Sequence, residues 1–436
     1  MSNQFSRRTF VQGTVGLGVA GVTAALPRRS MAAASSEVHI GCVGVGGKGW
    51  SDMEETSAGN QIVAICDVDE ARLAKAAEKF PKAKRYTDWR KLLEQTDIDA
   101  VTVSIPDHMH APVTMSALQA GKHTYTQKPL SHSVFEARQL AAAAKKHKAV
   151  TQMGIQHHSN TFFKTAVRLV QDGVIGKVSD VHVWTDRPNG FWEQNKDRGP
   201  SKPTPDQLHW NNWLGVAPER PYADGYHPFH WRAFWDFGTG ALGDMGCHGM
   251  DPVVTALELA APTMIVPTGP LPNAETGPAW SILKYSFPAT RWTVGPLEMT
   301  WYDGAKLPPR ELFEIGSDEK ILENGILFIG EKGQLLVDYF NPPKLLPQGD
   351  FAETKIDPAP IDNHYTQWTD AIKGIGKTSC PFDYSGPLTE TVLLGNVAVR
   401  TGKPVQWDAK SMRCDSDAAN AMLHREYRDG WQVAGL

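Results

Sequence analysis

Residues 38–49 read Val38-His39-Ile40-Gly41-Cys42-Val43-Gly44-Val45-Gly46-Gly47-Lys48-Gly49. The apolar run predicts a buried strand, and the glycines complete a G-x-G-x-x-G pattern that precedes a helix-like stretch to about residue 58. Gly44 permits the tight turn, Gly46 lets the backbone approach a pyrophosphate, and Gly49 lets helix and strand pack closely. The helix N-terminus then faces the phosphates. The residues predicted to contact a dinucleotide here are Gly44, Gly46, Gly47 and Gly49.

A carboxylate follows at the distance that this pattern requires. The second predicted strand, residues 61–66, ends in Asp67, which lies 23 residues beyond Gly44. About 20 residues separate the glycines from the acid that binds the adenosine ribose. Asp67 repels a 2′-phosphate and no arginine follows it directly, so NAD is favoured over NADP.

Strands and helices alternate in the segment that follows. The expected strands are 100–104, 123–126 and 149–153, and the expected helices are 70–79, 111–120 and 134–146. Repeated strand–helix units with short links predict a parallel, doubly wound sheet. Cys42 and Cys66 fall inside apolar runs and are expected to be buried thiols rather than ligands.

Composition limits the class of protein. The 436 residues suggest two or three domains, and 41% apolar with 21% charged residues exclude a largely disordered chain. A net charge of -4 gives no indication of nucleic acid or an anionic membrane as a partner. No apolar run is long enough to span a bilayer. Five cysteines do not make a disulfide scaffold.

The first 34 residues have the features of an export signal. Arg7 and Arg8 precede a Gly/Ala-rich stretch over residues 13–26, and Ala32-Ala33-Ala34 suits a signal peptidase. Paired arginines are typical of the twin-arginine route, which moves folded proteins, so we expect export to the periplasm. The alternative is a disordered tail with a chance pair of arginines.

Two further motifs carry a resemblance to a known family. After the strand expected at 100–104 the chain reads Pro106-Asp107-His108-Met109-His110-Ala111, and after the strand expected at 123–126 it reads Gln127-Lys128-Pro129. A later stretch reads Asp244-Met245-Gly246-Cys247-His248 and is followed by Asp251. Together these resemble the Gfo/Idh/MocA oxidoreductases, whose hallmarks are a Glu-Lys-Pro triplet and a D-x-x-x-H motif. Gln127 departs from that pattern.

The resemblance, which covers about residues 38–407, implies a fold and an assembly. It implies an N-terminal Rossmann domain at 37–155 and a C-terminal α/β domain with a large, mostly antiparallel sheet at 156–407, followed by a tail at 408–436. That sheet often forms the interface of a homo-oligomer, here a dimer or a tetramer. The residues that the resemblance places at the cofactor pocket are Pro106, His110, Gln127 and Lys128.

The same motifs suggest a chemistry. Hydride transfer from a secondary alcohol needs a group that takes the hydroxyl proton and a positive neighbour for the developing alkoxide. Lys128, at the carboxyl end of a parallel strand, can hydrogen-bond the substrate hydroxyl and the nicotinamide ribose. His248 is expected to take the proton, and Asp244 to orient it or to bind a second sugar hydroxyl.

Glycines and Pro252 lead us to expect a turn at 244–250, with Asp251 as the N-cap of the next helix. A metal is not expected at this site. The chain has many potential ligands nearby, but no spacing among them matches a zinc pattern. These are His108, His110, His157, His158, Cys247 and His248.

Residues 184–237 hold six of the fourteen tryptophans and show no clean period, which predicts a long ordered loop. Aromatic faces with polar tips suit sugar rings, so Trp231, Trp235 and His230 are candidate substrate contacts. The alternative is that these aromatic residues only anchor the loop.

These features predict an exported NAD-dependent oxidoreductase that acts on a secondary hydroxyl of a sugar, glycoside or cyclitol. No free nicotinamide pool exists outside the cytoplasm, so the cofactor is expected to be tightly held and recycled in place. One alternative is a glycosidase-like enzyme that oxidises a sugar transiently, eliminates the aglycone and returns the hydride. The other is a catalytically silent sugar-binding protein.

Overall fold

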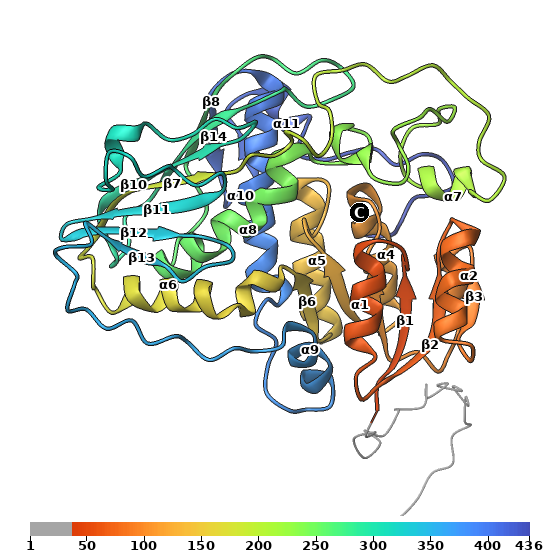
Figure 1. Ribbon diagram of the computed structural model, residues 1–436. Helices are drawn as coiled ribbons and strands as arrows, with labels where there is room; N and C mark the ends of the chain where they lie inside the picture. The colour runs from red at the N-terminus through yellow and green to blue at the C-terminus, as the bar shows by residue number, and fades with distance from the viewer. Residues whose placement is uncertain (1–36) are drawn as a thin grey trace, which may run out of the picture. The chain divides into compact units, whose positions relative to one another are not determined.

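The computed structural model describes residues 37–436, and the first part of them forms a six-stranded parallel sheet flanked by helices (Figure 1). The predicted export signal at 1–34 lies outside the described residues. The strands are β1 (His39–Val43), β2 (Gln61–Cys66), β3 (Lys84–Tyr86), β4 (Ala100–Val103), β5 (His123–Gln127) and β6 (Thr151–Gly154). The helices between them are α1 (Lys48–Thr56), α2 (Glu70–Lys79), α3 (Trp89–Leu93), α4 (His110–Gln119) and α5 (Val134–His147). The predicted doubly wound sheet is confirmed, with β3 and α3 as additions.

The strand order places a crevice at the glycine motif. The order β3-β2-β1-β4-β5-β6 reverses between β1 and β4, and such a reversal opens a ligand site outside the carboxyl ends of the strands. Gly44 has φ +81°, and a Cβ on it would lie 2.2 Å from the carbonyl oxygen of Ser104. A Cβ on Gly49 would lie 2.1 Å from the carbonyl oxygen of Gly44. Backbone proximity therefore requires glycine at both positions.

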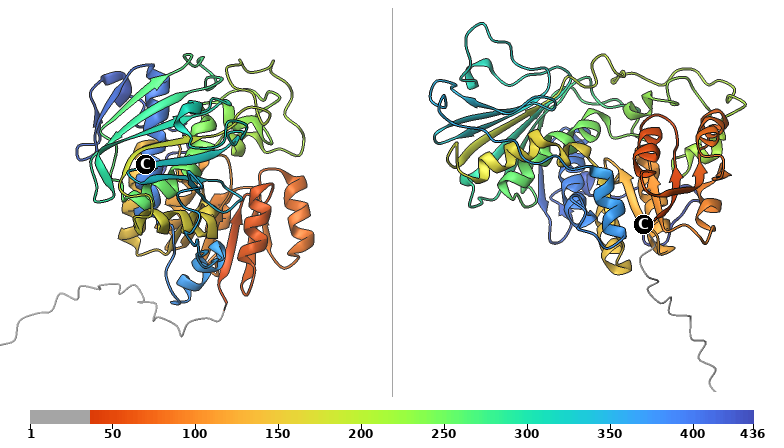
Figure 2. Two further views of the ribbon diagram at one scale, coloured as in Figure 1. Left: turned by 60° about the vertical axis from the view of Figure 1, so that its left-hand side comes forward. Right: turned by 60° about the horizontal axis from the view of Figure 1, so that its bottom comes forward.

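The second part of the chain forms the large, mostly antiparallel sheet that the resemblance implies (Figure 2). Its nine strands run in the order β13-β12-β11-β7-β10-β9-β8-β14-β15, and only the β7–β10 pair is parallel. The strands are β7 (Val178–Trp184), β8 (Met264–Thr268), β9 (Ile282–Phe287), β10 (Thr293–Tyr302), β11 (Gly325–Gly330), β12 (Gly333–Val337), β13 (Lys344–Leu346), β14 (Val405–Asp408) and β15 (Arg413–Cys414).

Further helices follow the parallel sheet in the chain. The longer ones are α6 (Thr161–Gln171), α8 (Gly240–Leu257), α9 (His364–Ile372) and α10 (Phe382–Thr401). Shorter ones are α7 (Trp210–Leu214), α11 (Asp417–Asn420) and the 3-10 turns η1 (Asp107–Met109), η2 (Gln156–Ser159), η3 (His230–Ala233) and η4 (Arg310–Leu312). One apolar core includes Leu140 of α5, Val253 of α8, Val392 of α10 and Trp301 of β10. It joins the two halves into one compact unit. None of the helices within residues 37–436 has the length and apolar character to cross a bilayer.

The prediction of a turn at 244–250 is wrong, because α8 runs unbroken through this stretch and past Pro252. Asp251 is a buried residue inside the helix rather than its N-cap. The glycines allow this helix to pack closely against its neighbours and do not interrupt it. A Cβ on Gly249 would lie 2.6 Å from Cγ1 of Val183 in β7, and one on Gly246 would lie 3.2 Å from the side chain of Val392 in α10. Tertiary packing overrides the weak helix propensity of glycine here.

The aromatic segment, residues 185–237, is largely irregular, and Trp184 belongs to β7 rather than to the predicted loop. Several of its rings form a buried cluster that includes Trp192, Trp213, Tyr226 and Phe237. The segment runs from β7 across the top of the view to α7, which lies beside α2 (Figure 1). These buried rings anchor the segment.

Two substitutions in α8 test the packing argument. Gly249→Ala should lower the free energy of unfolding by about 1–3 kcal/mol, because the methyl group overlaps Val183. Gly246→Ala should change it by less than about 1 kcal/mol, because the gain in helix propensity offsets a milder contact. Urea unfolding followed by circular dichroism measures both. Equal stability of the two variants would contradict the close approach of α8 to β7.

Candidate active site

A cleft of about 570 Å³ lies between the two halves, at the reversal point of the parallel sheet. It brings together most of the residues predicted from sequence: Gly44, Gly46, Gly47, Asp67, Pro106, His110, Gln127, Lys128, Trp231, Asp244 and His248. Gly49 lies behind the loop, against Gly44. His230 and Trp235 do not line the cleft. His230 lines a separate groove with Phe191, and Trp235 faces a small pocket beside His132.

The glycine end of the cleft fits a dinucleotide. Asp67 is held there by two backbone amides, since its Oδ2 accepts from Val45 N–H and its Oδ1 from Asp69 N–H, both at 3.0 Å. Burial raises the pKa of Asp67, and the two N–H donors oppose that rise. A Cβ on Gly47 would meet no atom within 4 Å, so the loop backbone is open to a ligand. These residues suit a pyrophosphate on the glycines and a ribose at the carboxylate.

Lys128 and Asp244 form an ion pair across the cleft. The Nζ of Lys128 lies 2.8 Å from Oδ1 of Asp244 and also donates to the Asp244 carbonyl oxygen at 2.8 Å. Arg232 donates to the same Oδ1 at 3.2 Å. Burial works against the ionised carboxyl, but the charges of Lys128 and Arg232 outweigh it and lower the pKa of Asp244. Sequence motifs did not indicate Arg232, which approaches Asp244 from η3.

His248 lies one helical turn after Asp244 but does not bond to it, contrary to one of the expected roles of Asp244. Its Nδ1 is buried and has no partner among the described residues. Burial, followed by the charge of Lys128, lowers the pKa of His248 well below its ordinary value. The ring is therefore neutral near pH 7, and a neutral imidazole has one nitrogen that can accept a hydrogen bond or a proton.

The other predicted residues have defined places. The ring of His110 contacts the carbonyl oxygens of Pro129 at 2.6 Å and Ile105 at 2.7 Å, so it joins two loops at the cleft wall. Burial lowers its pKa. Trp231 lines the cleft, but the guanidinium of Arg232 lies 4.3 Å from its ring centroid. That contact leaves less of this ring for a sugar.

Gln127 is explained by a buried acid that the sequence reasoning missed. Its Nε2 donates to Oδ2 of Asp52 at 2.8 Å, and Asp52 in α1 is fully buried. Ser104 donates to the same oxygen at 2.7 Å, and Lys48 and Tyr365 hold the other oxygen at 2.9 and 3.0 Å. The carboxylate is thus present beside position 127 rather than at it. The sequence signal that could have indicated Asp52 is its position in the first turns of α1, on the side that faces the sheet.

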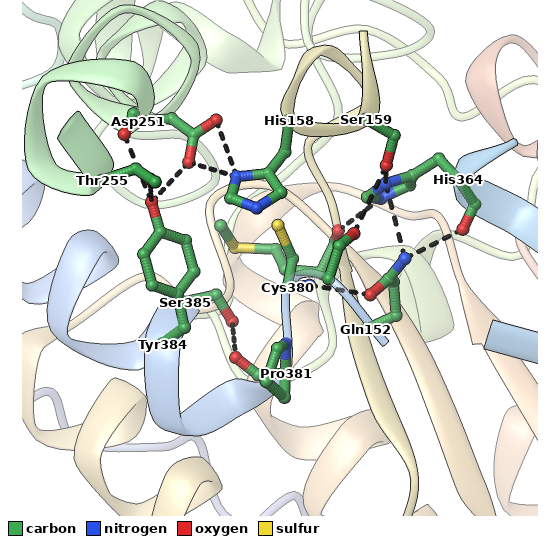
Figure 3. Close-up of polar contacts among 12 residues, drawn as sticks. Gln152, His158, Ser159, Asp251, Thr255, His364, Cys380, Pro381, Tyr384 and Ser385 are labelled. Carbon is green, nitrogen blue, oxygen red and sulfur yellow. Dashed lines mark hydrogen bonds and ion pairs between the residues drawn. The ribbon is translucent and has the colours of Figure 1, made fainter. Parts of the chain in front are cut away.

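One group of three potential metal ligands occurs among residues 37–436, namely His158, Asp251 and Cys380 (Figure 3). His158 Nδ1 lies 2.8 Å from Asp251, and the hydroxyl of Tyr384 donates to the same carboxylate at 2.5 Å. Burial raises the pKa of the Cys380 thiol well above its ordinary value. Hydrogen bonds already satisfy the carboxylate, so the group joins η2, α8 and α10 as a structural network.

Comparison with known proteins identifies both halves. Residues 38–155 match the model of an oxidoreductase family with an NAD-binding Rossmann fold, and residues 159–285 match the C-terminal alpha/beta domain of the same family. Two solved structures share the fold. The WlbA dehydrogenase from Bordetella pertussis, in complex with NADH and UDP-GlcNAcA, has a TM-score of 0.59 at 16% identity and covers 85% of this chain and 99% of its own. GenD2 from gentamicin A biosynthesis, in complex with NAD, has a TM-score of 0.59 at 21% identity and covers 88% and 100%.

Curated relatives match over shorter stretches. A levoglucosan dehydrogenase of Pseudarthrobacter phenanthrenivorans is 25% identical over 187 residues, 43% of this chain and 40% of that protein. A glycosyl hydrolase family 109 protein of Saccharopolyspora erythraea is 27% identical over 288 residues, 59% of this chain and 56% of that protein. An inositol 2-dehydrogenase of Salmonella paratyphi B is 28% identical over 150 residues, 33% of this chain and 45% of that protein. The chain thus spans between 40% and 56% of the length of these relatives.

Exchanging the acid and the amide between positions 52 and 127 tests the hydrogen bonds that surround Asp52. Gln127→Glu should lower the free energy of unfolding at pH 7 by about 1–3 kcal/mol, because two carboxylates then compete for one buried site. The loss should shrink at acid pH, where one carboxyl takes a proton. Asp52→Asn with Gln127→Glu restores one acid and one amide and should recover most of the stability. Wild-type stability of Gln127→Glu at pH 7 would contradict the network.

Proposed function

Because the chain belongs to the Gfo/Idh/MocA oxidoreductase family, we propose that it oxidises a secondary hydroxyl of a sugar, glycoside or cyclitol with NAD. The observation that carries this proposal is the shared cleft. Lys128, Asp244 and His248 face the same space as the glycine loop that suits the dinucleotide. The levoglucosan and inositol dehydrogenases among the relatives support a polyhydroxylated substrate.

The residues divide the chemistry as follows. Bound NAD supplies the hydride acceptor. The ammonium of Lys128 donates to the substrate oxygen and stabilises the negative charge that develops there. Asp244 holds that ammonium in place through the 2.8 Å ion pair, and Arg232 fixes Asp244.

His248 accepts the hydroxyl proton in this proposal. Burial keeps its imidazole neutral before the reaction, so the ring nitrogen is free to act as a base. The nearby charge of Lys128 disfavours the imidazolium that results.

Lys128→Ala tests this assignment. It should lower kcat by about a hundredfold or more, a typical scale for the loss of a donor that stabilises a developing negative charge on oxygen, and leave nucleotide binding nearly intact. Lys164→Ala is the matched control, since Lys164 also pairs with an aspartate, Asp362, but lies outside the cleft. A panel of sugars and cyclitols, read at the nicotinamide absorbance, measures both variants. Unchanged turnover of Lys128→Ala would remove Lys128 from the mechanism.

The same panel separates the alternatives. Release of an aglycone without net NADH would point to transient oxidation and elimination, which the glycosyl hydrolase family 109 relative brings into consideration. Binding of a sugar with no turnover of any substrate would point to the silent binding protein.

We also propose that the protein is exported by the twin-arginine route to the periplasm and keeps its cofactor there. Arg7 and Arg8 support the route, and the absence of a free nicotinamide pool outside the cytoplasm requires that the cofactor be recycled. Retention with a Kd near 1 nM needs about 12 kcal/mol. The proposal includes a homo-oligomer, a dimer or a tetramer, formed through the nine-stranded sheet.

Counting the cofactor tests retention. The exported protein, purified without added nucleotide and then denatured, should release close to one nicotinamide nucleotide per chain. Arg7→Lys with Arg8→Lys should keep the protein in the cytoplasm and controls for the route. An empty exported protein that gains full activity on addition of micromolar NAD would contradict recycling and leave the Rossmann assignment intact.

A further inference from the structure

Part of the aromatic segment lies against the Rossmann half rather than over a sugar site. We name residues 205–231 the clasp. Its backbone pairs with the start of α2, where Glu70 N–H donates to Gln207 at 3.0 Å and His209 N–H donates to Val68 at 2.9 Å. Asp69 and Leu208 form an antiparallel bridge between these two bonds. The clasp therefore meets the chain directly after Asp67, the predicted ribose ligand.

Side chains of the clasp also contact the residues that follow β2 and β3. His227 Nε2 lies 3.0 Å from Oδ2 of Asp69, and Asn212 Nδ2 donates to the carbonyl oxygen of Thr87 at 3.0 Å. Asp69 N–H in turn donates to Asp67. Two hydrogen bonds thus connect His227 with the carboxylate at the ribose end of the cleft.

Stacked aromatic rings and a residue near the C-terminus hold the clasp in place. Trp210 stacks on Trp213 with ring centroids 4.8 Å apart and an interplanar angle of 13°, and Tyr226 stacks on Trp210. Arg428, near the C-terminus, donates to the carbonyl oxygens of Gly215 and Asn211, both at 3.0 Å. These contacts fix the clasp without any help from a ligand.

The inner side of the clasp forms one wall of the cleft. Its lining residues are Asn212, Trp213, His227, Pro228, Phe229 and Trp231. They face the cleft that the glycine loop and Asp67 also line. We propose that the clasp binds the adenosine half of NAD and slows its release. This inference rests on the proposed function and gives retention of the cofactor a structural cause.

The test compares two histidines of the clasp that contact α2. His227 pairs with Asp69 and lines the cleft, whereas His209 pairs with Glu70 at 2.8 Å on the exposed surface. The protein is loaded with NADH, and release is followed by fluorescence after a chase with excess NAD. His227→Ala should speed release about tenfold or more, the scale of a lost hydrogen bond to a charged group. His209→Ala should change it by less than about threefold, because exposed pairs contribute little.

Ligands that contain only one half of the dinucleotide show which half the clasp binds. The reduced nicotinamide mononucleotide lacks adenosine, so His227→Ala should leave its affinity unchanged and should weaken ADP-ribose about tenfold. Asn212→Ala, which removes a different contact of the clasp, should act in the same direction, and circular dichroism verifies that both variants fold. Wild-type release rates of NADH from both variants would overturn the clasp but not the proposed function. A wild-type protein that binds neither NADH nor ADP-ribose would overturn both.

Discussion

The ion pair between Lys128 and Asp244 is the interaction on which the site depends. It joins the carboxyl end of β5 to α8, and both side chains are largely buried, with exposed fractions of 15% and 16%. Removing Asp244 would leave the Lys128 ammonium buried without its counter-charge, which costs about 3–5 kcal/mol for such a pair, whereas Asp244 without Lys128 would still have Arg232 at 3.2 Å. The two halves of the chain are thus held in register at the point where substrate and cofactor must meet.

Much of the Rossmann half could be predicted, because its signals are local. The bounds of β2 and α2 agree with those expected from strand and helix patterns, and the glycine motif lies in the expected turn. The neutral state of His248 could not be predicted, since it depends on burial and on Lys128, far away in the sequence. The helix through Gly246 and Gly249 depends likewise on close packing against β7 and α10.

The aromatic segment shows the limit of reasoning from residue type. Tryptophan suits a sugar ring and a loop anchor equally well, and only the fold distinguishes them. Trp235 lies away from the cleft, and Trp213 serves as both an anchor and a cleft wall. Asp52 shows a second limit, because its link to the motif at Gln127 is visible only in the folded chain. A departure from a motif at Gln127 is offset by a carboxylate that lies 75 positions away in the chain.

The contacts of Arg428 have a consequence for biosynthesis. This residue follows all strands of both sheets in the chain, yet it braces the clasp beside the cofactor cleft. The hydroxyl of Tyr427 also donates to Glu136 of α5 at 2.6 Å. When the ribosome has made only the Rossmann half, the glycine loop exists, but the clasp that forms one wall of the cleft does not. On the proposed role of the clasp, stable binding of the nucleotide would then begin only after synthesis of the whole chain.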